Sequence, residues 1–93
     1  MIVGVLTLDL AVFESQGLKD KRRVIQSVKK RLQNTFNVSV AEVDYCDLPK
    51  RCKLGVAIVC NESRPIHSQL DKVVELVQRC AGLTLLSHER QLL

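Results

Sequence analysis

The stretch from residue 18 to residue 32 reads LKDKRRVIQSVKKRL and predicts an amphipathic helix over about 18–34. Its apolar residues recur at helical spacing and would form one buried stripe of Leu18, Ile25, Val28 and Leu32. Between residues 19 and 31 the same stretch holds seven of the chain's 14 lysines and arginines, against one acid, Asp20. We therefore expect one helix that packs through one face and carries positive charge on the others.

Alternating apolar residues predict strands on both sides of this helix. The pattern places strands at 2–13, 36–45, 53–60 and 83–92, and a second helix at 65–80. Gly17 is the expected N-cap of the basic helix and Ser63 that of the second helix, and Gly82 is the expected C′ residue that follows the second helix. Within 36–45 the parity of the apolar positions flips, and a bulge near Ala41 or Glu42 would explain the flip.

The predicted order is strand, helix, strand, strand, helix, strand. Two βαβ halves, roughly 2–45 and 53–92, would stack as a split repeat, and right-handed crossovers would put both helices on one side. The sequence thus predicts the α+β class: a ferredoxin-like βαββαβ sandwich, with two helices on one face of a four-stranded antiparallel sheet. Residues 1–93, with 46% hydrophobic and 26% charged residues, fit a single domain of this kind.

Two helices leave one sheet face open. That face would carry small aliphatic residues: Val3, Val5, Thr7, Ala57 and Val59. It is either a tolerated apolar surface or the contact surface of a partner, including a second copy of the chain. The second reading supports an alternative function, a protein-interaction or regulatory module that dimerises through its sheet.

The cysteines and histidines do not form a metal-binding pattern. No two of Cys46, Cys52, Cys60 and Cys80 are spaced as Cys-x-x-Cys, so we expect no metal site and no cofactor. Cys46 and Cys52 flank a short connection and could pair on oxidation, but reduced thiols are the default in a cytoplasmic protein. The N-terminus carries no signal-peptide pattern and no apolar run reaches about 20 residues, so we expect a cytoplasmic location and no membrane partner.

Catalytic motifs are missing from the sequence. The glycines are scattered, so no phosphate-binding loop is formed, and no nucleophile motif occurs. Asp44 and Asp47 could form a carboxylate pair, but turn and capping roles explain them better. We therefore expect no enzymatic activity and no catalytic residue.

Positive charge is the strongest functional signal. RNA binding through stacked aromatic residues of the sheet is excluded, since 53–60 carries no aromatic ring. The simplest interpretation of the basic helix is a solvated face that aids solubility, yet a mixture of positive and negative charges serves solubility better. We expect instead that its cations contact phosphates of structured RNA or a ribosomal subunit: Lys19, Lys21, Arg22, Arg23, Lys29, Lys30 and Arg31. Lys50, Arg51 and Lys53 would extend this patch if their turn lies near the helix.

Several stretches together resemble the YlxP-like bacterial family, a domain of unknown function. They are Met1–Leu6, Ser15–Arg23, Phe36–Asp44 and Leu54–Ala57. The resemblance covers nearly the whole chain and implies the same ferredoxin-like fold. It also implies a ribosome-associated role, because genes of that family tend to lie near translation-initiation and ribosome-maturation genes. It supplies no catalytic residues. The hypothesis from sequence is thus a non-enzymatic RNA-binding, ribosome-associated accessory factor.

Overall fold

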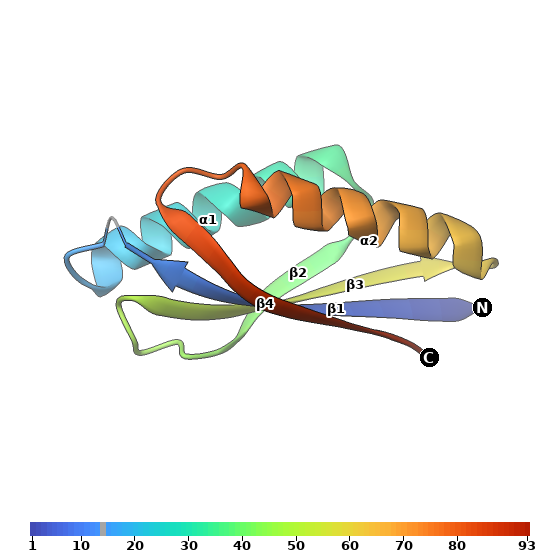
Figure 1. The fold of residues 1–93 in the computed structure, drawn as a ribbon, viewed down its shortest axis with the longest axis horizontal. Coiled ribbons are helices and arrows are strands. Elements are labelled where there is room, and N and C mark those ends of the chain that lie inside the picture. The colour runs from blue at the N-terminus through green and yellow to red at the C-terminus, as the bar shows by residue number, and fades with distance from the viewer. Residues whose placement is uncertain (14) are drawn as a thin grey trace.

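A four-stranded antiparallel sheet carries both helices on one face in the computed structural model of the chain (Figure 1). The structure describes residues 1–13 and 15–93. The elements are β1 (Ile2–Val12), α1 (Leu18–Thr35), β2 (Ser39–Asp44), β3 (Arg51–Cys60), α2 (Ser63–Gln78) and β4 (Leu83–Leu92). The strand order is β2-β3-β1-β4, and all neighbours are antiparallel. The predicted ferredoxin-like βαββαβ sandwich is confirmed.

The core lies between the sheet and the helices. Successive side chains of a strand point to opposite faces, so every second residue of β1 and β3 lies under the helices. On β1 these are Leu6, Leu8, Leu10 and Val12, and on β3 they are Cys52, Leu54, Val56 and Ile58. The helices cover them with aliphatic residues, chiefly Ile25, Val28, Leu32, Ile66, Leu70, Val73 and Val77.

Gly4 allows α2 to approach β1 closely. A Cβ atom at this position would lie 2.3 Å from Cγ2 of Ile66 and 3.0 Å from Cγ2 of Ile58. The first distance is far below ordinary van der Waals contact, so a side chain here would push α2 away from the sheet.

The second strand is shorter than predicted. β2 begins at Ser39 rather than at residue 36, because Phe36 ends α1 and donates its backbone N–H to the carbonyl of Leu32. Phe36 and Val38 still pack against the core from outside the strand. The predicted bulge is confirmed one position further along, since the pairing of β2 with β3 shifts between Glu42 and Asp44.

The helix ends agree partly with expectation. Gly17 is the N-cap of α1, as predicted. The N-cap of α2 is Glu62, and Ser63 is its first helical residue. Gly82 has a positive φ of 85° in the turn before β4 but lies three residues beyond the C-cap, Arg79. No helix of the described part is both long and apolar enough to cross a membrane.

The open face carries the residues expected there. Val3 pairs with Val59 and Val5 with Ala57 across β1 and β3. Val59 is 59% exposed, and Val43 of the bulge is 55% exposed, with Cγ1 2.9 Å from the position of a Cβ at Gly55. The apolar part of the open face therefore extends over β1, β3 and β2.

Candidate nucleic-acid interface

Six of the seven cations expected to contact phosphates lie on the surface of α1. Lys29 is half-buried, and the other five are exposed: Lys19, Arg22, Arg23, Lys30 and Arg31. Their positions relative to the buried stripe follow from the 3.6-residue turn of the helix. The charged surface is therefore a direct consequence of which side of α1 packs on the sheet.

Lys21 does not belong to this surface, and its assignment as a phosphate contact is wrong. Its side chain is 0% exposed and belongs to the stripe that packs inward, together with Ile25, Val28 and Leu32. An ammonium group enclosed by protein cannot reach a phosphate in solution. The spacing already contained the signal, since Lys21 lies between Leu18 and Ile25 at intervals of three and four residues.

The buried ammonium group of Lys21 is enclosed by oxygen atoms. Nζ donates hydrogen bonds to the backbone carbonyls of Tyr45, at 2.7 Å, and Cys46, at 3.4 Å. Oε2 of Glu42 lies 2.8 Å from Nζ. The two opposite charges therefore form an ion pair at the base of α1. Lys21 thus ties the connection between β2 and β3 to the first turn of α1.

Cys52 borders the same cluster. Burial, followed by the negative charge of Glu42, raises the pKa of the Cys52 thiol to about 12.

The connection between β2 and β3 turns at Tyr45, whose φ of 61° lies in the left-handed region. Oδ1 of Asp44 accepts a hydrogen bond from the Tyr45 N–H. Asp44 therefore has the turn role that the sequence favoured for it.

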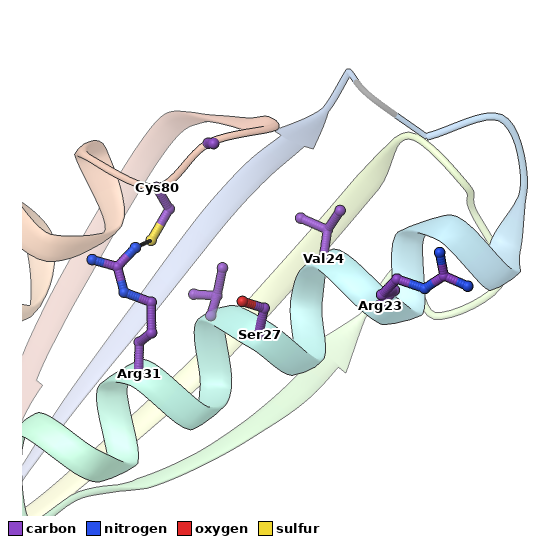
Figure 2. A pocket seen from close by; sticks show the side chains of 7 residues that line it. Arg23, Val24, Ser27, Arg31 and Cys80 are labelled. Carbon is purple, nitrogen blue, oxygen red and sulfur yellow. Dashed lines mark hydrogen bonds between the residues drawn. The ribbon is translucent and has the colours of Figure 1, made fainter.

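The six surface cations of α1 fall into three groups around the helix. Lys19, Arg23 and Lys30 follow the side opposite the buried stripe. Arg22 and Lys29 share the flank away from α2. Arg31 is on the flank toward α2, where Nη1 lies 3.6 Å from Sγ of Cys80 (Figure 2).

None of these six cations forms a salt bridge within residues 1–13 and 15–93. The ion pairs found there join Lys21 to Glu42, Arg51 to Asp9, and Arg90 to Asp71. The positive charge of α1 is therefore largely uncompensated by the described acids and faces solvent.

The proposed extension of the patch to the next connection is only partly supported. The turn does lie against α1 through Lys21, and Lys50 is exposed. Arg51 and Lys53, however, lie on the open face of the sheet, where their charged groups are 4.8 and 5.5 Å from the ring centre of Tyr45. Arg51 also pairs with Asp9 at 2.8 Å. These two cations therefore belong to a separate cluster.

The four cysteines are free thiols; Cys46 is exposed, and Cys52 and Cys80 are buried. Burial raises the pKa of Cys80, and the nearby charge of Arg31 opposes that rise. Among the described residues, no three side chains of His, Cys, Asp or Glu lie close enough together to hold a metal ion.

Comparisons with known proteins found one relative by sequence and several solved structures. The chain is 29% identical over 76 residues to the uncharacterized protein YlxP of Bacillus subtilis (strain 168). This aligned segment covers 82% of this chain and 83% of that protein. Among solved structures, the de novo designed protein Foldit4 matches with a TM-score of 0.56 and 11% identity, over 100% of this chain and 97% of that one. A designed protein with a ferredoxin fold, LFR1 1, matches 99% of this chain and 84% of its own at a TM-score of 0.45 and 18% identity.

The likeness to Foldit4 describes architecture and carries no activity with it. The model of a protein family of unknown function, DUF503, matches residues 3–90, which is nearly the whole chain. The chain therefore belongs to the DUF503 family.

Proposed function

We propose that the protein is a non-enzymatic accessory factor that binds structured RNA, such as that of a ribosomal subunit, through the exposed cations of α1. The observation that carries this proposal is the set of six surface cations on one helix without an ion pair in the described part of the chain. Like charges at this density cost helix stability, and phosphate binding would offset that cost.

The spacing of the cations suits a duplex backbone. Lys19 and Lys30 are eleven residues apart, which corresponds to about 16 Å along the helix axis. Arg22 and Arg31 widen the charged surface on the two flanks. Such a surface contacts phosphates without reading bases, and double-stranded RNA is recognised mainly by its shape and backbone.

The test is co-sedimentation with ribosomal subunits over a salt series. If α1 neutralises about six phosphates, the logarithm of the association constant should fall with the logarithm of salt concentration at a slope of roughly −4 to −5.5. The variant R22E/R23E/K30E should abolish the association while the far-UV circular dichroism stays native, since all three side chains are exposed.

A matched control carries the same change of charge elsewhere. Lys53, Arg64 and Arg90 are cations outside α1, and K53E/R64E/R90E alters the net charge equally. This control should keep most of the association. Equal loss in both variants would mean that net charge, rather than α1, governs binding, and unchanged association in the α1 variant would refute the proposal.

The exposed apolar sheet face favours a second candidate, a regulatory module that dimerises through β1, β2 and β3. Val59 and Val43 are more than half exposed there, and contiguous apolar surface of this kind often marks a contact. Under this candidate, Val59→Asp should convert a dimer into a monomer in analytical ultracentrifugation. A wild-type protein that is monomeric at high concentration would dismiss it.

A further inference from the structure

The groove between α1 and the end of α2 is a second feature of the charged surface. Its floor is apolar, and it is formed by Val24, Val28, Cys80 and Ala81. The hollow encloses about 290 Å³ and is open to solvent along α1 (Figure 2). We call this hollow the interhelical groove.

Two arginine side chains line the groove, and the guanidinium of Arg31 points toward Cys80 (Figure 2). Arg23 and Arg31 are eight residues apart, about 12 Å along α1, and Ser27 places its hydroxyl between them. The only hydrogen bond of the Arg31 guanidinium among the described residues is with Sγ of Cys80, a weak acceptor at 3.6 Å. The lining contains no carboxylate, so the groove suits a ligand that combines negative charge with an apolar body.

A second hollow continues the groove past Arg31. Arg31 is shared by both, and the second hollow adds Phe36 and Leu76 as apolar surface and Lys72 and Arg79 as cations. Glu75 is its one acid. Each of the two hollows between α1 and α2 therefore combines an apolar floor with cations at its border.

We propose that this groove takes unpaired nucleotides of the RNA that α1 binds. The inference rests on the proposed function and deepens it. A nucleotide supplies both parts that the groove requires, a base with an apolar face and phosphates on either side. Guanidinium planes such as that of Arg31 also stack on bases, and unpaired nucleotides are the usual targets of specific RNA recognition.

Continuity between the two surfaces favours a nucleotide over an acidic peptide. Arg23 belongs both to the outward row of α1 and to the border of the groove. A backbone that follows the outward row would pass beside the groove at Arg23, so a base that leaves the RNA helix there is within reach of it. The protein would then prefer RNA that carries a bulge.

The experiment compares two RNA hairpins by fluorescence anisotropy, one fully paired and one with a two-nucleotide bulge. Wild-type protein should bind the bulged hairpin roughly tenfold more tightly, the scale of one stacked base. Ser27→Leu fills the groove without changing charge and should abolish this preference while leaving the affinity for the paired hairpin unchanged. Gln26→Leu adds the same side chain at an adjacent exposed position outside the groove, and should keep the preference.

The outcomes separate the inference from the proposed function. Equal binding of both hairpins by wild type, or equal effects of the two leucine variants, would overturn the inference and leave RNA binding by α1 in place. Failure to bind either hairpin at low salt would overturn both. Displacement of the bulged hairpin alone by a poly-glutamate peptide would assign the groove to an acidic protein segment and also overturn the inference.

Discussion

Replacing Glu42 should lower the free energy of unfolding by more than its partly exposed position suggests. Glu42→Leu leaves the Lys21 ammonium group, which is 0% exposed, with two backbone carbonyls and no counter-charge. Breaking a buried ion pair costs about 3–5 kcal/mol. Because the Glu42 side chain is 20% exposed and water can reach the vacated site, we expect the lower end, about 3 kcal/mol.

The double variant K21M/E42L should recover most of that loss. An apolar pair of similar volume removes the uncompensated charge, so its stability should lie within about 1 kcal/mol of wild type. The carbonyls of Tyr45 and Cys46 lose their donor, but Cys46 is exposed and its carbonyl can bind water. The coupling free energy between Lys21 and Glu42 should therefore be large compared with that of a surface pair.

The assay is urea denaturation at pH 7 followed by circular dichroism. In a parallel thermal melt, a loss of about 3 kcal/mol would lower Tm by roughly 12–24 °C in a domain of this size. Asp71→Leu is the matched control, because it breaks the surface pair with Arg90 and should cost less than about 1 kcal/mol. The reasoning is refuted if E42L lies within 0.5 kcal/mol of wild type, or if the double variant loses the sum of the single losses.

Two further changes test the core. Burial raises the pKa of Cys52 in the folded protein to about 12, so the thiol contributes its full stability below the unfolded pKa, near 9, and the free energy of unfolding should fall by about 1.4 kcal/mol per pH unit between these two pKa values. Cys52→Ala should flatten this fall with pH, as measured by urea titrations at pH 8–11. If the variant and the wild type lose stability in parallel, the burial argument is contradicted. Gly4→Ala should destabilise by about 1–3 kcal/mol, because its Cβ would meet Ile66. Gly17→Ser serves as its control, since no atom lies within 4 Å of a Cβ there, and thermal melts that rank the two variants equally would disprove the close approach.

Local periodicity was sufficient to predict the elements, because burial repeats every two residues in strands and every three or four in helices. The long apolar runs of β1 and β3 and the stripe of α1 follow this rule directly. The errors concern ends and caps. Phe36 has the alternation of a strand, yet its backbone N–H completes α1 instead, a choice that depends on a hydrogen bond rather than on composition.

The cationic character of α1 and its division into a packed and a solvated side could be predicted from sequence, since both depend on residues of a single helix. The sequence did not reveal which of these cations remain exposed to solvent. Lys21 is buried because its partners come from elsewhere in the chain: the carbonyls of Tyr45 and Cys46, 24 and 25 residues away, and Glu42 on β2. A charge is stable inside a protein only where such oxygens converge, and that convergence exists only after β2 has paired beside α1. The interhelical groove likewise exists only because the end of α2 lies beside α1, which brings Cys80 to Arg31 across 49 residues of sequence.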